Sequence, residues 1–144
     1  MGSAMAALGV AATFVWFGMV LAISFLEAPL KFRAPGVTVP IGLGIGRLVF
    51  RALNVAEVVL GAAVVVAVAT AAEYGASATV ASVVALAALA VQLIVVRPWL
   101  SKRTARVLAG DTEGPRSRAH LGYVALEVVK AVALLVAGVA LVTG

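Results

Sequence analysis

The chain has 144 residues, of which 64% are hydrophobic and 12% charged, with a net charge of +5 at pH 7. Its mean hydropathy is +1.17, and a soluble domain this small leaves too much of its surface in water to hide so much apolar area. Cysteine is absent, which excludes disulfides and thiolate ligands. The basic residues lie between apolar runs without an aromatic-interleaved basic face, which argues against nucleic acid as a partner.

Four apolar runs are each long enough to cross a bilayer, because about 20 helical residues span the hydrocarbon core. They predict a single transmembrane domain over residues 1–144, an all-α membrane protein built as a four-transmembrane-helix bundle. The predicted spans are residues 5–28, 53–72, 79–96 and 121–142.

The linkers between these spans differ. Pro29, Pro35 and Pro40 favour breaks in the helix after the first span. The stretch from Ile41 to Arg51 predicts a short helix at the membrane interface, and a second short helix is expected before Gly110. The second and third spans are joined by a short turn, which predicts a tight helical hairpin.

Basic residues predict the orientation of the chain. They flank the two long linkers and are missing from the termini and from the short turn. By the positive-inside rule, both linkers are expected in the cytoplasm, with the N-terminus and the C-terminus outside. The residues concerned are Lys31, Arg33, Arg47, Arg51, Arg97, Lys102, Arg103, Arg106, Arg116 and Arg118.

The two halves of the chain resemble each other. The segment RLVFRALNVAEVVLGAA aligns with SRAHLGYVALEVVKAVA and places Glu57 over Glu127. The preceding spans each end in a basic segment that contains proline, EAPLKF and RPWLSKR. Two repeated helical hairpins of the same orientation would produce this pattern, and so would chance similarity between helices rich in alanine and valine.

A few polar groups lie inside the spans, where each charged side chain costs at least about 2.5 kcal/mol. On the fourth span, polar residues recur at spacings of three, four and three, which places them along one helical face. Asn54 and Glu57 are also three residues apart and are expected to share a face. The candidate ligand-binding residues are Glu27, Asn54, Glu57, His120, Tyr123, Glu127 and Lys130.

Two interpretations of these residues remain open. They form either a structural network that pairs its own charges across the helices, or a cavity in the cytoplasmic half of the bundle that binds a cation, a proton or a polar ligand. His120, Tyr123, Trp16 and Trp99 also fit residues at the membrane interface.

Metal and cofactor binding are poorly specified by the sequence. A single histidine excludes bis-histidine haem within one monomer. Glu27, Glu57, Glu127 and His120 together could ligate a hard cation. No metal or cofactor is identified.

The segments EAPLKF…RLVF and RPWLSKRTARVLAG, followed by a histidine and a tyrosine, carry a family resemblance. With them the chain resembles the transmembrane-protein-205-like family of small four-helix membrane proteins, over most of its length. The animal members have been associated with resistance to metal-containing drugs, so the resemblance implies a role in transport or tolerance. The long acidic loop insert of the animal members is absent from this chain.

The sequence favours a small integral membrane protein for transport or for binding a ligand or cation. Its expected partners are membrane lipids and a second copy of the chain or another membrane protein, because four helices are few for a complete transporter. One alternative is an accessory subunit of a membrane complex. Another is a membrane-embedded enzyme that acts on a lipid, with His120 and a glutamate as acid and base.

Overall fold

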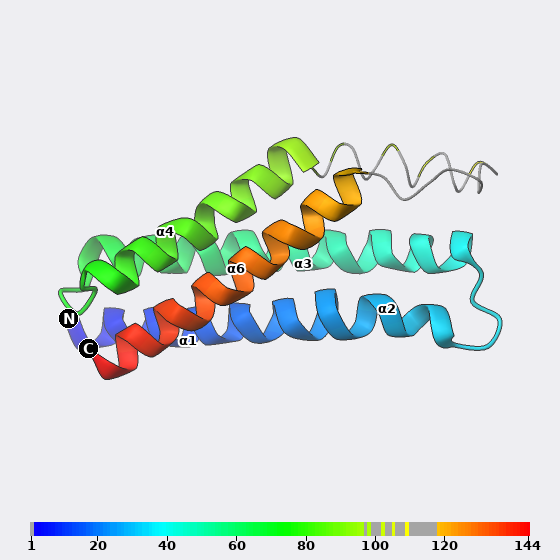
Figure 1. Ribbon diagram of the computed structural model, residues 1–144. Coiled ribbons are helices and arrows are strands. Elements are labelled where there is room, and N and C mark those ends of the chain that lie inside the picture. The colour runs from blue at the N-terminus through cyan, green and yellow to red at the C-terminus, as the bar shows by residue number, and fades with distance from the viewer. Residues whose placement is uncertain (1, 97, 99–101, 103–104, 106–108, 110–117) are drawn as a thin grey trace.

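Four long helices make up the described part of the chain (Figure 1). The computed structural model describes residues 2–96, 98, 102, 105, 109 and 118–144. The helices that are long and apolar enough to cross a membrane are Ala4–Arg33, Val39–Thr70, Ala76–Val95 and Leu121–Thr143. The predicted all-α four-helix bundle is confirmed, and these helices identify an integral membrane protein in contact with lipid.

The first helix continues through Pro29 without a break. It begins as α1 (Gly2–Val20), becomes the π-helix η1 (Leu21–Glu27) and ends as α2 (Ala28–Leu30) and the 3₁₀ turn η2 (Lys31–Arg33). A proline crowds the carbonyl four residues before it, and the π turn changes the hydrogen-bond register just before this point: the Ala28 amide donates to the Ile23 carbonyl, five residues back. The expected break at Pro29 is therefore wrong.

The second helix, α3 (Val39–Thr70), begins earlier than its predicted span. The Thr38 hydroxyl caps the helix by accepting a hydrogen bond from the Ile41 amide at 3.3 Å. Pro40 lies in the first turn, where its missing amide costs nothing. The separate interfacial helix expected from residue 41 to residue 51 is instead the first part of α3.

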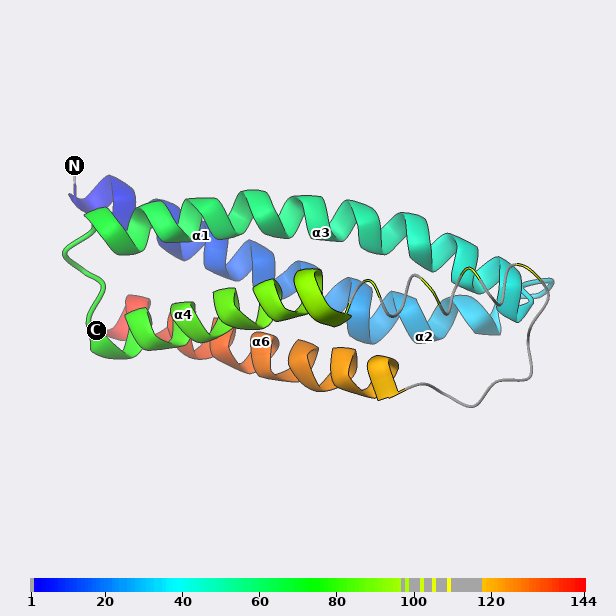
Figure 2. The same cartoon turned by 90° about the horizontal axis from the view of Figure 1, so that it is seen from above.

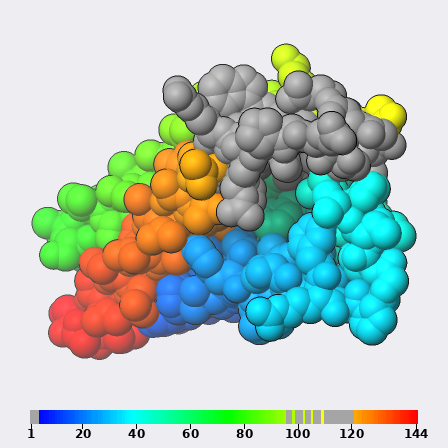
Figure 3. All heavy atoms as spheres, turned by 45° about the vertical axis from the view of Figure 1, so that its right-hand side comes forward, coloured from blue at the N-terminus to red at the C-terminus, as the bar shows by residue number. Residues whose placement is uncertain are grey.

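Close packing explains why this extension of α3 is stable. Gly42 lies against the ring of Phe32, and Gly46 lies against Lys31, so the two helices approach where neither glycine has a side chain. Figure 3 turns the end of the bundle that holds η2 and the start of α3 toward the viewer. The short helix expected before Gly110 lies outside the described residues.

The second half of the chain forms another helical pair. A short turn leads into α4 (Ala76–Val91), which continues as the π-helix η3 (Gln92–Val96), and α6 (Arg118–Thr143) is the last helix. α4 packs along α6, α1 packs against both α3 and α6, and α3 touches α4 only sparsely (Figures 1 and 2). The bundle therefore consists of two hairpins joined mainly through α1 and α6.

The two hairpins bury equivalent positions. Five buried positions of α3 recur 70 residues later in α6, as Leu53, Glu57, Gly61, Val64 and Ala67 against Tyr123, Glu127, Ala131, Leu134 and Ala137. Four buried positions of α1 recur 69 residues later in α4, as Ala12, Thr13, Trp16 and Val20 against Ala81, Ser82, Ala85 and Leu89. This agreement favours repeated hairpins over chance similarity of composition.

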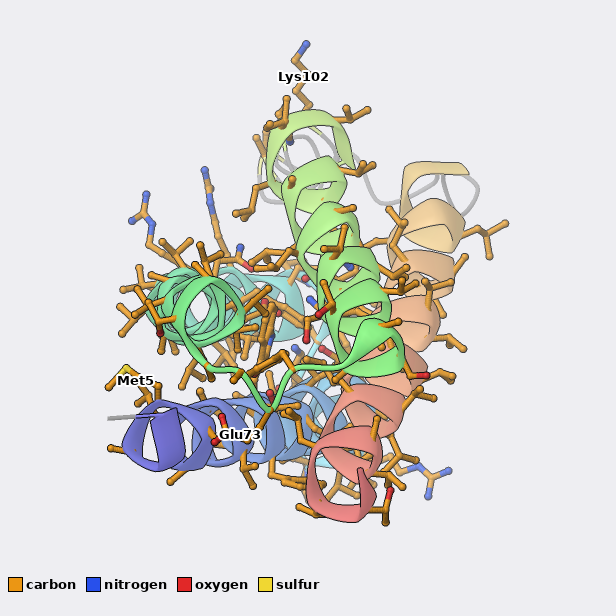
Figure 4. All side chains as sticks on the ribbon, turned by 90° about the vertical axis from the view of Figure 1, so that its left-hand side faces the viewer. Met5, Glu73 and Lys102 are labelled. Carbon is orange, nitrogen blue, oxygen red and sulfur yellow. The ribbon has the colours of Figure 1, made fainter. Side chains whose placement is uncertain are left out.

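The two ends of the bundle differ in charge. Both termini and the turn between α3 and α4 lie at one end (Figure 1). Figure 4 looks onto that end, with Met5 and Glu73 near the viewer and Lys102 at the far end. η2 and the start of α3 lie at the opposite end (Figure 1), and these two elements carry Lys31, Arg33 and Arg47. We call this basic end the linker end.

Candidate functional site

Lys130 lies at the centre of a group of charged and polar side chains inside the bundle. Its side chain is fully buried on α6, and its Nζ lies 2.5 Å from Glu57 Oε2 and 2.5 Å from Glu127 Oε1. Nζ also donates a hydrogen bond to Gln92 Oε1 at 2.7 Å. An ammonium group has three protons to donate, so its hydrogen-bonding capacity is fully used.

The two carboxylates around Lys130 have further donors. Trp16 Nε1 donates to Glu57 Oε2 at 2.8 Å. Gln92 Nε2 donates to Glu127 Oε1 at 2.8 Å, and the Ser24 hydroxyl donates to Glu127 Oε2. We call the six residues the charged network; they are Trp16, Ser24, Glu57, Gln92, Glu127 and Lys130.

All four spans contribute to the charged network. The donors Trp16 and Ser24 come from α1 and η1, and Glu57 comes from α3. Gln92 opens η3, and Glu127 and Lys130 lie on α6. Each π-helix thus supplies one member, in keeping with the frequent occurrence of π turns at functional sites.

The charged network holds one more carboxylate than ammonium. Glu57, Glu127 and Lys130 carry a formal charge of −1 when all three are ionised, and their side chains are at most 2% exposed. A net charge at this depth is costly, and one added proton makes the group neutral. Glu57 Oε1 is buried and accepts no hydrogen bond from the described residues. Glu57 therefore has the chemistry of a proton acceptor.

The depth of the network follows from helix geometry. We take Arg51 as the edge of the hydrocarbon core, since twenty residues counted back from Thr70, at the other end of α3, reach Arg51. Glu57 is six residues beyond Arg51, so it lies about 9 Å inside this edge at 1.5 Å per residue. Half of the hydrocarbon core is about 15 Å thick. The network therefore occupies the half of the bundle nearer the linker end.

The structure brings together some of the predicted site residues. Glu57, Glu127 and Lys130, three of the seven candidate residues, are in contact with one another through Lys130 Nζ; a role in binding a ligand stays a prediction. Glu27 lies outside this group, since its Oε2 pairs with Lys31 Nζ at 3.8 Å. Asn54 lines a groove on the outer side of α3. Three residues advance a helix by about 300°, which leaves Asn54 about 60° away from Glu57.

The aromatic residues differ from their expected positions. Trp16 and Tyr123 are both buried, so the expectation that they form an interfacial belt is wrong. The Tyr123 ring meets the Phe50 ring edge to face, with centroids 5.8 Å apart, and its carbonyl accepts a hydrogen bond from Gln92 at 3.4 Å. The side chains of His120 and Trp99 lie outside the described residues.

Two members of the network carried little signal in the sequence. Trp16 lies near the middle of its span rather than at either end, and a buried indole N–H needs an acceptor; this position could have indicated its role. Ser24 gave no such signal, because serine in a helix commonly bonds its own backbone.

Metal binding by the predicted residues finds no support in their arrangement. Among the described residues, no three histidine, cysteine, aspartate or glutamate side chains converge to hold an ion. Glu27 stands apart from the two network glutamates, so the predicted hard-cation set of Glu27, Glu57, Glu127 and His120 is not assembled by its described members.

No protein-family model, curated protein or solved structure matches the chain.

Proposed function

We propose that the protein is a small membrane transport protein that carries protons across the bilayer and binds one proton at a time in the charged network. The observation that supports this proposal is the buried group of two carboxylates around one lysine, which needs one more proton to be neutral. Ionisable side chains inside membrane spans commonly mark ion or proton pathways. Glu57 is the proposed acceptor, because one of its oxygens has no hydrogen-bond donor in the described structure.

The position of the network between the two hairpins supports this proposal. Glu57, Trp16 and Ser24 belong to the first hairpin, and Glu127, Lys130 and Gln92 belong to the second. Many transporters hold their coupling ion at the interface between two repeats, and rocking of one repeat against the other exposes the site. Such a motion would open the predicted cavity toward the linker end, which we propose faces the cytoplasm.

The proposal extends to the size of the working unit and to the family resemblance. A four-helix chain offers little room for a substrate path, so we expect the working unit to be a homo-oligomer or a complex with a membrane partner. The resemblance to the transmembrane-protein-205-like family, with its implied role in transport or tolerance, fits a proton carrier.

Proton flux into liposomes tests the proposal. Purified protein is reconstituted with a pH-sensitive dye inside, and a potassium diffusion potential drives protons inward. We expect internal acidification above that of empty liposomes, reduced at least tenfold by Glu57→Gln. Glu73→Gln is the matched control, because Glu73 is exposed in the turn between α3 and α4. Equal flux in the wild type and Glu57→Gln would contradict the proposal.

A second candidate function is an accessory subunit whose charged network only fastens its helices together. The observation that favours it is the closure of the network, whose three charged side chains are at most 2% exposed. Infrared spectroscopy separates the two functions. A protonated carboxyl band that titrates and disappears in Glu57→Gln supports proton binding, whereas no titrating band and no flux would favour the accessory subunit.

A further inference from the structure

A groove lies on the outer side of α3, away from the charged network. It has a volume of about 480 Å³ and is lined by α3 and by Leu93 of η3. Its volume falls within the range of about 300–1,000 Å³ that is usual for ligand pockets. α3 and α4 pack only sparsely against each other, which leaves room for the groove between α3 and Leu93 of η3.

The groove is basic at one end and apolar at the other. Arg47, Arg51 and Asn54 line the part nearer the linker end, and Val55, Val58, Val59 and Leu93 line the rest. Both arginines are exposed, and neither has an ion pair or hydrogen bond in the described part of the chain. Lys31, by contrast, is paired with Glu27. The two guanidinium groups are therefore available to an anion.

The spacing of these residues matches one leaflet of a bilayer. Twenty residues counted back from Thr70 reach Arg51, so a core of about 30 Å places Arg51 at its edge. Arg47 lies one turn further out, at the level of the head groups. Val59 lies eight residues beyond Arg51, about 12 Å further along the helix, which is close to the depth of one leaflet. A lipid with its phosphate at the arginines would lay an acyl chain over the valines.

We propose that this groove binds an anionic phospholipid of the linker-end leaflet. Arg47 and Arg51 hold its head-group phosphate, Asn54 donates a hydrogen bond at the head-group boundary, and Val55, Val58, Val59 and Leu93 hold an acyl chain. Charge complementarity selects the head group, because basic pockets between membrane helices bind anionic lipids, and arginine binds phosphate with two parallel hydrogen bonds. This site is independent of the proton-binding function proposed for the charged network.

Native mass spectrometry of the protein in detergent tests the site. The probes are phosphatidylglycerol and phosphatidylcholine with identical acyl chains. We expect phosphatidylglycerol to bind preferentially and Arg47→Gln/Arg51→Gln to lower its affinity about 25-fold, since each surface arginine contributes about fivefold. Arg33→Gln is the matched control, an exposed arginine of η2 outside the groove, and should change the affinity less than twofold.

A second variant separates a shaped groove from general attraction of charge. Val58→Trp leaves both arginines in place and fills the apolar end, so it should also weaken phosphatidylglycerol binding. Several results would overturn the proposal: no preference for phosphatidylglycerol, an Arg33→Gln effect as large as that of the double variant, or no effect of Val58→Trp. Equal binding of water-soluble glycerophosphate would indicate a soluble anion, and dimers lost in Val58→Trp would indicate a second copy of the chain in the groove.

Discussion

The environment of Lys130 sets the electrostatics of the bundle at the scale of single residues. Its ammonium group lies between two carboxylates at 2.5 Å and is closed to solvent. Removing one member of a buried ion pair typically costs about 3–5 kcal/mol, because the remaining charge is left without a partner. With two carboxylates present, however, the loss of one still leaves a balanced pair. The loss of stability in a variant should therefore depend on the net charge that remains in the network. The hydrogen bonds that the substitution removes should matter less.

The net charge left in the network predicts the order in which its variants lose stability. Glu57→Gln and Glu127→Gln each leave one carboxylate beside Lys130 and should cost less than about 2 kcal/mol, the scale of one hydrogen bond to a charged group. The double variant leaves Lys130 alone, and Lys130→Met leaves two carboxylates facing each other. Both should cost about 3–5 kcal/mol. Unfolding in detergent, followed by circular dichroism, measures the series.

The pair formed by Glu27 and Lys31 supplies the control for this series. Its atoms are 3.8 Å apart, and the Glu27 side chain is 34% exposed. The Lys31 side chain is 10% exposed, so the pair is partly buried, but its separation is long and water reaches Glu27. Ion pairs that water reaches contribute about 0–1 kcal/mol, so Glu27→Gln should cost no more than about 1 kcal/mol. Single glutamine variants as destabilising as the double variant would show that net charge does not decide the stability of the network.

At the scale of the helices, close approach depends on positions without a side chain. On α1, Gly9 lies against the Tyr74 hydroxyl, and a Cβ there would also lie 3.0 Å from Ala67 Cβ. At Gly18, on the same helix, a Cβ would meet no neighbouring side chain or other segment of the chain within 4 Å. The two glycines therefore separate packing from helix propensity.

Gly9→Ala should destabilise the protein by about 1–3 kcal/mol, the usual cost of overpacking. Gly18→Ala should be neutral or stabilising by up to about 1 kcal/mol, because alanine favours helix over glycine. Adding Tyr74→Phe to Gly9→Ala should recover part of the loss, since the clashing hydroxyl is gone. Thermal unfolding in one detergent compares all three variants. Equal effects of the two alanine substitutions would show that α1 does not approach its neighbours as closely as the structure has it.

The helices were predictable from the sequence to different degrees. Long apolar runs dictated four spans, since lipid leaves few other ways to satisfy the backbone. The sequence did not indicate that α3 starts at Val39, because proline and glycine usually signal a break in a helix. Here Phe32 packs on Gly42, and a contact between two helices cannot be read from the local sequence. The path of the first helix through Pro29 depends on a π turn, which hydrophobic periodicity does not indicate.

The charged network was predictable only in part, for a similar reason. Glu57, Glu127 and Lys130 stood out as charges within spans, and the alignment of the two halves of the chain placed Glu57 over Glu127. Which donors complete the network depends on how the helices rotate against each other, so Ser24 could not be assigned to Glu127 beforehand. The place of Asn54 also depends on this rotation. Glu127 and Lys130 are three residues apart and both belong to the network, so the same spacing between Asn54 and Glu57 did not decide whether Asn54 belongs to it.

At the scale of the whole molecule, the charges divide the bundle into two ends. Every lysine and arginine except Lys130 flanks one of the two long linkers. The turn between α3 and α4 carries Glu73 and no basic residue. Basic loops are retained in the cytoplasm during insertion. This asymmetry should therefore orient the protein with the linker end, and the basic end of the groove on α3, on the cytoplasmic side.

Cysteine labelling tests this orientation, because the natural chain contains no cysteine. Ser3→Cys and Ser77→Cys, at the end with the termini, should react with a membrane-impermeant maleimide on intact cells. Ala34→Cys and Ser117→Cys, in the two linkers, should react only after permeabilisation. Ser82→Cys is the control for accessibility, since Ser82 is buried within α4 and should stay unlabelled in both cases.

Each pattern of labelling has a distinct meaning. Reaction of the linker positions alone on intact cells would reverse the orientation while keeping four spans. Reaction of Ser3→Cys and Ser117→Cys from the same side would contradict the arrangement itself, because an odd number of crossings separates them in the bundle. The expected pattern would place Arg47 and Arg51 in the cytoplasmic leaflet, where anionic lipids give a negative surface potential. It would also place Glu57 about 9 Å from the cytoplasmic edge of the hydrocarbon core at 1.5 Å per residue, so a proton from that side would have the shorter path to the network.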